Sequence, residues 1–207
     1  YENWCAKNVP DEGFWGHWPY RFKEMPLSSD FVKKARESSN AAIVVIGRSA
    51  GEDREQKLKK GSFYLANDEL DMLDKVCAVF RKVVLVLDTG NVIDFEQISD
   101  FGDNISAIVL AWQGGMESGR ALCNVLSGKV NPSGRLTDTI AIAYDAYPSS
   151  NQFGYKKFNI YEEDVFVGYR YFETFAKEEV LYPFGYGLSY TTFEIEGGVE
   201  KTPSGVR

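Results

Sequence analysis

Short continuous runs of apolar residues alternate along the chain with segments in which apolar residues recur every three or four positions. The continuous runs predict strands of a parallel sheet, at residues 42–47, 83–87 and 107–112. The recurring pattern predicts helices at residues 28–40, 67–80 and 117–127, with a short helix at 94–101. This alternation predicts an α/β sandwich, in which a mostly parallel sheet carries helices on both faces in flavodoxin-like layers. We expect the run at 42–47 to be buried on both faces.

Polar residues at the ends of these patterns predict where the helices begin and end. The hydroxyl of Ser28 or Ser29 is expected to cap the first helix. Asn67 is expected to cap the second helix, and Gly128 is expected to end the third.

The two ends of the chain lack these periods. Residues 1–26 are rich in tryptophan and proline, which predicts an irregular N-terminal arm. From residue 129 the chain is rich in turn residues, aromatic residues and glycine, which predicts added C-terminal strands or long packing loops. We therefore predict one α/β domain over residues 27–196, and a linker or tail over residues 197–207.

The charge balance and the lengths of the apolar runs argue against two classes of partner. Lys and Arg number 23 against 30 Asp and Glu, and this net charge of −7 disfavours a nucleic acid. No apolar run approaches the roughly 18 residues of a membrane-spanning helix, so we expect no membrane partner.

Few side chains suit metal binding or nucleophilic catalysis. The three cysteines are widely spaced, and Cys77 and Cys123 fall on apolar helix faces, which predicts buried free thiols and favours a reducing, cytoplasmic location. The one histidine, His17, is not accompanied by a GxSxG motif or a cysteine cluster. We therefore expect neither a catalytic triad nor a metal site, and no organic cofactor.

A carboxylate stands on a small-residue loop directly after the first predicted strand. Glu52 follows Gly47 and Gly51 at the carboxyl end of that strand, where α/β proteins bind their ligands. The residues alone leave two interpretations open. Glu52 is either a solvated loop charge, or an acid whose pKa is tuned by burial and by Arg48 and Arg54.

A second loop, Gln113-Gly114-Gly115, is expected at the same edge of the sheet, because it follows the third predicted strand. Neither loop matches GxxxxGK[ST], and the dinucleotide motif GxGxxG is absent. A nucleotide-binding or flavodoxin-like regulatory domain is disfavoured for this reason.

Several strings of the sequence resemble one known family. They are "AIVVIGRSAGEDR", "KGSFYLANDEL", "KVVLVLDTGNVID", "AIVLAWQGGMESGRALCNVLSGKVNPSGRLTDT", "YEEDVFVGYRYFET" and "YPFGYGLSYTTF". In this order they are similar to the α/β-sandwich domain of glycoside hydrolase family 3, the β-glucosidase group. The resemblance runs from about residue 41 to residue 193, and it is closest to members in which this domain precedes the barrel domain.

The resemblance implies a role for the loop carboxylate. Family members are typically retaining β-glycosidases in which a TIM-like barrel carries an Asp nucleophile and the sandwich domain lends a Glu as general acid/base. The matching residue here is Glu52, with Glu55 as the alternative, while we interpret Asp53 and Arg54 as partners that hold the loop and not as catalysts. In related loops one or two residues often stand between the glutamate and the Asp-Arg pair, whereas here Asp53 follows Glu52 directly.

The resemblance also implies a substrate and a partner. We expect part of a β-glucosidase that releases glucose from the non-reducing end of β-linked oligosaccharides or glucosides, and that is inactive without the barrel domain. A β-xylosidase or another β-glycosidase of the family is the near alternative, and a non-catalytic sugar-binding or scaffold module is the more distant one. A homo-oligomer stays open.

Aromatic and cationic side chains offer further candidate substrate contacts. Trp15, Tyr155 and Arg54 are the candidates, and Trp18 and Phe158 belong to the same aromatic set. Because indole and phenol rings suit both sugar faces and apolar interiors, these aromatics line an outer sugar subsite or pack in a core or domain interface. Packing is the interpretation that we favour for them.

Overall fold

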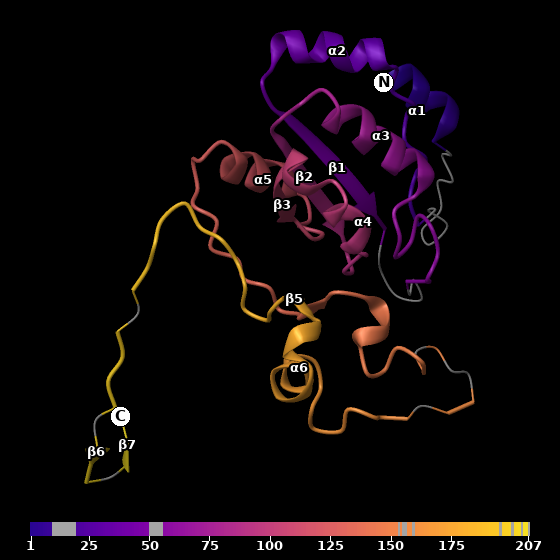
Figure 1. Cartoon of the computed structure of the whole chain (residues 1–207). Coiled ribbons are helices and arrows are strands. Elements are labelled where there is room, and N and C mark those ends of the chain that lie inside the picture. The colour runs from indigo at the N-terminus through magenta and orange to yellow at the C-terminus, as the bar shows by residue number, and fades with distance from the viewer. Residues whose placement is uncertain are drawn as a thin grey trace.

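A three-stranded parallel sheet forms the centre of the fold (Figure 1). The computed structural model describes residues 1–9, 20–49, 56–152, 154, 157–158, 160–194, 196–199, 201–203 and 205–206. The strands lie in the order β1 (Ala42–Arg48), β2 (Val83–Thr89) and β3 (Ile105–Leu110). Their register pairs Ala42 with Val83 and Arg48 with Thr89, so β1 and β2 end together.

Helices alternate with these strands along the chain, as the hydrophobic pattern predicted. They are α2 (Ser29–Ser38), α3 (Asn67–Cys77), α4 (Glu96–Ser99) and α5 (Ser118–Leu126), with a 3₁₀ turn at Gly102–Asn104. In Figure 1, α2 and α3 lie on one side of β1, and α5 lies across the sheet beside β3. The predicted α/β fold is therefore confirmed.

The helix ends follow the predicted capping chemistry with one exception. Ser28 Oγ accepts a hydrogen bond of 3.2 Å from the backbone N–H of Phe31, which caps α2. Gly128 follows α5 at φ +74°, a backbone conformation that favours glycine. The prediction for α3 was wrong by one residue, because Ala66 is its N-cap and Asn67 lies inside the helix.

The main core lies between the sheet and the helices α2 and α3. It contains Val44 and Ile46 of β1, Leu85 and Leu87 of β2, and Leu73 of α3. Alternate residues of a strand point to opposite faces, so their neighbours Ile43 and Val45 face away from this core. Ile43 is 57% exposed and Val45 is 49% exposed. The expectation that β1 is buried on both faces was therefore wrong.

The cysteines are free thiols, but not all of them are buried. Cys77 of α3 lies in the core, as expected. Cys123 of α5 is exposed, contrary to the expectation, because α5 carries no buried residue.

A second, smaller group of elements follows α5. Strand β4 (Ile140–Ala141) pairs antiparallel with β5 (Val180–Tyr182), beside α6 (Tyr169–Phe175) and 3₁₀ turns at Tyr144–Ala146 and Lys177–Glu179. Residues 169–175 were expected to be extended, and they are helical instead. Aromatic side chains three residues apart share one helix face, and Phe172 on α6 is 1% exposed.

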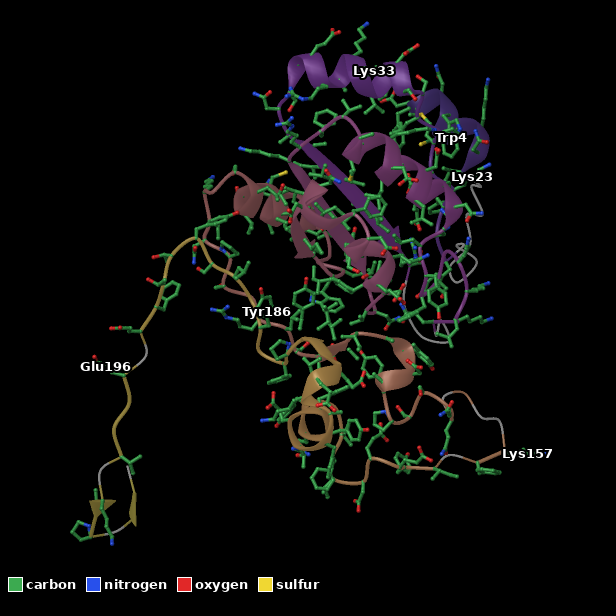
Figure 2. The ribbon with its side chains drawn as sticks, viewed as in Figure 1. Trp4, Lys23, Lys33, Lys157, Tyr186 and Glu196 are labelled. Atoms are coloured by element: carbon green, nitrogen blue, oxygen red, sulfur yellow. The ribbon has the colours of Figure 1, made fainter. Side chains whose placement is uncertain are left out.

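The two ends of the chain lie outside the central sheet. The arm contains a short helix, α1 (Glu2–Asn8), which the aperiodic N-terminal pattern did not predict and which is drawn beside α2 and α3 in Figure 1. The C-terminal segment carries β6 (Lys201–Thr202) and β7 (Gly205–Val206) and extends away from both groups in Figure 1. The carbonyl of Tyr186, which follows β5 and is labelled in Figure 2, accepts a hydrogen bond of 2.8 Å from the N–H of Leu136. Within the described ranges, no helix is both long enough and apolar enough to cross a membrane.

Candidate functional site

The residues that the sequence singled out for chemistry fall mainly outside the described part of the chain. Glu52, Arg54, Trp15 and Tyr155 lie outside the described residues, as do Asp53, Glu55 and Trp18. Phe158 is described and is 57% exposed, so it is not a core residue. The site is therefore built from the described residues on either side of residues 50–55 and from the strand ends around them.

Arg48 ends β1 and points into the protein. Its guanidinium meets the carboxylate of Glu69 through Nη1–Oε1 at 2.5 Å and Nη2–Oε2 at 2.7 Å, and its Nε donates to the carbonyl of Ser62 at 3.2 Å. Both charged side chains are 1% exposed. The charge of Arg48 is thus balanced internally by Glu69, which differs from the sequence expectation that it tunes a loop carboxylate.

Glu69 also organises the first turn of α3. Its Oε2 accepts a hydrogen bond of 2.7 Å from the N–H of Ala66, the residue before the helix. A carboxylate three residues after the N-cap satisfies a backbone donor that has no partner within the helix and interacts favourably with the helix dipole. The three-residue spacing from Ala66 to Glu69 is a local sequence signal for this role, but the prediction of Asn67 as the cap hides it.

A second ion pair ties the N-terminal arm to the same turn of α3. Arg21 contacts both carboxylate oxygens of Asp68, at 2.5 and 3.0 Å, and the N–H of Glu24 donates to Asp68 at 2.7 Å. Burial opposes ionisation of Asp68, but these hydrogen bonds and the charge of Arg21 hold its pKa below the ordinary value. Glu24 responds in the opposite direction: burial, Glu69 and Asp68 raise its pKa.

The residues on both sides of 50–55 are held at the carboxyl ends of β1 and β2. On the first side, the N–H of Ser49 donates to the carbonyl of Tyr20 at 2.7 Å. On the second side, Gln56 Nε2 donates to the carbonyl of Val92 at 2.6 Å, and the N–H of Lys57 donates to Ser62 Oγ at 2.9 Å. The described flanks of Glu52 therefore lie at the edge of the sheet where α/β proteins bind ligands.

The turn after β3 reaches the same edge, as the sequence predicted. Trp112 has φ +52°, which is unusual for a bulky residue, and Gly115 has φ +72°. Gly114 lies so close to Ser118 that an added Cβ would approach the Ser118 Cβ to 2.7 Å. This turn brings Gln113 Nε2 to 3.1 Å from the carbonyl oxygen of Arg48.

An open hollow of about 340 Å³ lies beside this turn. It is lined by Gly90, Trp112, Gln113, Thr137 and Asp138. An indole face with an amide and a carboxylate suits a ring that carries hydroxyl groups. A larger open hollow of about 400 Å³ lies along α6, lined by Val165, Phe166, Tyr169, Arg170, Glu173 and Thr174. Only the smaller hollow lies at the strand ends.

The sequence as a whole is similar to enzymes that cleave glycosidic bonds. The family model of the glycosyl hydrolase family 3 C-terminal domain matches residues 22–190. A β-glucosidase of Ruminococcus albus is 47% identical over the whole chain, which spans 22% of that protein. An exo-α-(1→6)-L-arabinopyranosidase of Bifidobacterium breve is 36% identical over 179 residues, which are 85% of this chain and 23% of that protein.

A solved structure agrees with this likeness in three dimensions. The crystal structure of a β-glucosidase from Paenibacillus barengoltzii matches with a TM-score of 0.91 and 45% sequence identity, over 96% of this chain and 22% of that one. The chain thus spans about a fifth of the length of these relatives. From the matching family model, the identity and the shared fold, the chain belongs to glycosyl hydrolase family 3 and is similar to its C-terminal α/β domain.

Proposed function

We propose that this chain is part of a retaining β-glucosidase and supplies its general acid/base, Glu52. The observation that carries the proposal is the 47% identity to the Ruminococcus albus β-glucosidase over all 207 residues. Because the chain spans only 22% of that relative, we further propose that the rest of the enzyme is a TIM-like barrel that carries an Asp nucleophile. The glycoside is then held between the two parts.

The proposed reaction has two steps with two carboxyl groups. In retaining enzymes these groups lie about 5–5.5 Å apart. In the first step the Asp attacks the anomeric carbon while the Glu52 carboxyl group gives its proton to the departing glycosidic oxygen. In the second step the Glu52 carboxylate takes a proton from water, the water oxygen bonds to the anomeric carbon, and the bond to the Asp breaks.

The described structure supports this placement of Glu52 through the residues around it. Ser49 and Gln56, which flank the segment, are both bonded at the carboxyl ends of the sheet. The Arg48–Glu69 pair and the bond from Gln113 add further contacts at the first flank. We therefore expect the Glu52 carboxylate to be presented at the edge of the sheet where α/β proteins bind ligands.

Leaving-group dependence tests the role of Glu52 in the complete polypeptide. Glu52→Ala should lower kcat/KM for cellobiose by about 10²–10⁴-fold, because its poor leaving group needs protonation. The same variant should form the glycosyl-enzyme from 2,4-dinitrophenyl β-glucoside at nearly the normal rate. Azide should rescue turnover and yield a β-glucosyl azide. Glu55→Ala is the matched control, and selective loss in that variant instead would move the role to Glu55.

The isolated 207 residues should not hydrolyse any glycoside, because the proposed nucleophile lies elsewhere. Purification after separate expression, followed by an assay with an aryl β-glucoside, measures this. Turnover by the isolated chain, abolished by Glu52→Ala, would overturn the division of the catalytic groups between two parts.

The identity of the sugar is open to a second candidate, which the arabinopyranosidase relative favours. That relative is 36% identical over 179 residues, so another pyranoside or a β-xyloside is the alternative substrate. A panel of nitrophenyl glycosides compares the candidates by kcat/KM.

The proposed sugar contacts are Arg54, Trp15 and Tyr155, and the alanine variant of each should have a higher KM. A chain that binds sugar with no turnover in the complete polypeptide would instead be a scaffold or sugar-binding module.

We also propose a cytoplasmic location, which the free thiols Cys5, Cys77 and Cys123 support. Cell fractionation with an antibody against the chain tests it, and recovery outside the cytoplasm would overturn it.

A further inference from the structure

We propose that β1 is an interior strand of a wider sheet in the complete protein. Its free edge and its exposed face bind an apolar strand and the connecting helix of that strand, both from a part of the polypeptide outside these 207 residues. The proposal goes beyond the function proposed above, because it concerns how the α/β domain is completed and not how a glycoside is cleaved.

The outer edge of β1 is open. The strand order is β1-β2-β3, so β1 has a neighbour on one side only. Successive residues of a strand turn their backbone groups to alternate sides, and the N–H of Ala42 donates to the carbonyl of Lys82 beside β2 at 2.9 Å. The N–H groups of Ile43, Val45 and Gly47 therefore point away from β2. No described residue outside the sheet accepts a hydrogen bond from them, and such a row of donors is a template for a further strand.

The composition of β1 is that of an interior strand. Residues 42–47 read Ala-Ile-Val-Val-Ile-Gly, without the charged residues or proline by which edge strands commonly avoid pairing. Strands inside a parallel sheet carry apolar side chains on both faces, because helices cover both. The side chains of β1 therefore suit a strand that has a neighbour on each side and a cover on each face.

The face of β1 opposite the main core lacks such a cover. Ile43 is 57% exposed and Val45 is 49% exposed. Val45 stands in register with Val86 of β2, so their side chains share a face, yet Val86 is 0% exposed. Burial of this face therefore ends between β2 and β1, on two large aliphatic side chains beside the open edge.

A parallel strand at the open edge would account for the open face as well. Parallel neighbours need a crossover connection of about a dozen residues or more, which is usually a helix packed on the sheet. The helices α2 and α3 already cover the core face of β1 (Figure 1). The connecting helix of the added strand therefore packs on the other face, over Ile43 and Val45.

The lengths of the relatives favour the same polypeptide as the source of this strand, and not a second copy of the chain. The 207 residues span 22% of the Ruminococcus albus β-glucosidase. The Paenibacillus barengoltzii enzyme contains the same fold, with a TM-score of 0.91, within 22% of its own chain. In both relatives most of the polypeptide is therefore available to cover this edge and face.

Amide hydrogen exchange in the complete polypeptide tests the edge. The N–H groups of Val44 and Ile46 face β2 and are the internal controls. If a strand pairs with β1, the N–H groups of Ile43 and Val45 should exchange within about tenfold of these controls, because each has an acceptor. Mass spectrometry with residue-level fragmentation measures all four. Faster exchange than this at Ile43 or Val45 would show an unpaired edge and overturn the proposal.

A charged substitution tests the face. Ile43→Lys in the complete polypeptide places an ammonium group under the proposed helix, whereas Ile43→Val is the matched apolar control. The midpoint temperature of thermal unfolding should be lower in Ile43→Lys than in Ile43→Val by about 5 °C or more. A smaller difference would show that the face stays open to water, and would overturn the proposal. The exchange measurement on the wild type decides the edge even if Ile43→Lys does not fold.

The oligomeric state separates the proposed strand from a second copy of the chain. Light scattering at two protein concentrations, beside the exchange measurement, makes this comparison. Protection of Ile43 and Val45 should persist in the monomer. Protection confined to a dimer and lost on dilution would assign the edge to a second copy and overturn the proposal. None of these measurements reads a catalytic step, so their outcome is independent of the role proposed for Glu52.

Discussion

Arg48 at the end of β1 and Glu69 in the first turn of α3 form a buried ion pair, with two side-by-side hydrogen bonds of 2.5 and 2.7 Å. The Glu69 carboxylate also accepts a hydrogen bond from the N–H of Ala66, and the Arg48 guanidinium donates one to the carbonyl of Ser62. Desolvation offsets much of the attraction in such a pair, so its main effect is to set where β1 ends relative to α3. Forming a buried pair therefore adds little net stability, whereas removing one partner leaves a buried charge and costs much more. The first prediction follows from this difference.

Removing one partner should be far more damaging than removing both. Arg48→Met leaves the buried Glu69 carboxylate with only Arg21, whose Nη1 lies 3.9 Å from its Oε1, as a nearby cation, and should lower the free energy of unfolding by about 3–5 kcal/mol. The double variant Arg48→Met with Glu69→Leu should recover most of that loss, because no uncompensated charge stays in the interior. Urea unfolding followed by tryptophan fluorescence measures both. A double variant no more stable than the single one would contradict this account.

Asp68 should make the attachment of the N-terminal arm dependent on pH. Its pKa in the folded protein is lowered, so its stabilising effect is present above the pKa of the unfolded chain, about 3.9, and is lost as pH falls through the folded value. Asp68→Asn should therefore be less stable than the wild type near neutral pH, and the difference should vanish in acid. Urea midpoints measured from pH 7 to pH 3 test this. A difference that grows as the pH falls would have the wrong sign.

Amide hydrogen exchange offers a local measure of the same contact. The N–H of Glu24 donates to Asp68 at 2.7 Å, so it should exchange faster in Asp68→Asn at neutral pH. The N–H of Val32, which donates to the carbonyl of Ser28 at the start of α2, is the control and should not change.

Two isoleucines of β1 should respond very differently to truncation. Ile46 is fully buried against the main core, whereas Ile43 on the same strand is 57% exposed. Ile46→Ala should lower the free energy of unfolding of the chain by about 2–5 kcal/mol, through lost burial and a residual cavity. Ile43→Ala should change it by no more than about 0.5 kcal/mol. Urea unfolding of the two variants compares them directly, and equal losses would mean that the two faces of β1 are equally covered.

Tyr147 should contribute to stability mainly through its hydroxyl group. The hydroxyl donates to the carbonyl of Thr139 at 3.1 Å and accepts from the N–H of Ala141 at 3.0 Å, and burial raises the pKa of the phenol. Tyr147→Phe leaves both backbone groups without this partner, and should lower the free energy of unfolding by about 1–3 kcal/mol. Tyr161→Phe, at a side chain that is 84% exposed, is the control. The midpoint temperature of thermal unfolding should therefore fall in Tyr147→Phe and stay unchanged in Tyr161→Phe.

Much of the α/β core could be predicted because its signals are local. The apolar runs predicted β1 and β2 to within two residues, because short runs rich in β-branched residues favour strands. For β3 the predicted run extended to Trp112, but the strand ends at Leu110, because Trp112 adopts a positive φ that strand pairing does not allow. The α6 helix was missed because aromatic residues flanked by glycine fit an extended segment and a helix equally well by local preference.

The candidate site shows the same division between local and non-local information. That the loops after β1 and β3 meet at one edge of the sheet could be predicted from chain order, because parallel strands present their carboxyl ends together. The partner of Arg48 could not, since two arginines and several carboxylates stand near one another in the sequence. Packing selected Glu69, 21 residues away, by burying both groups where neither could stay unpaired.

The sequence by itself determined the order of strands and helices from α2 to α5, the edge of the sheet at which the loops after β1 and β3 lie, and the family. Each depends on patterns within a few residues or on strings of consecutive residues. Only the tertiary structure decided that Arg48 faces inward, that Gln113 holds its carbonyl, and that Ile43 and Val45 are left exposed. These outcomes depend on which distant segments come within hydrogen-bonding or packing distance. Desolvation and packing set that choice as the chain folds, and no local pattern encodes it.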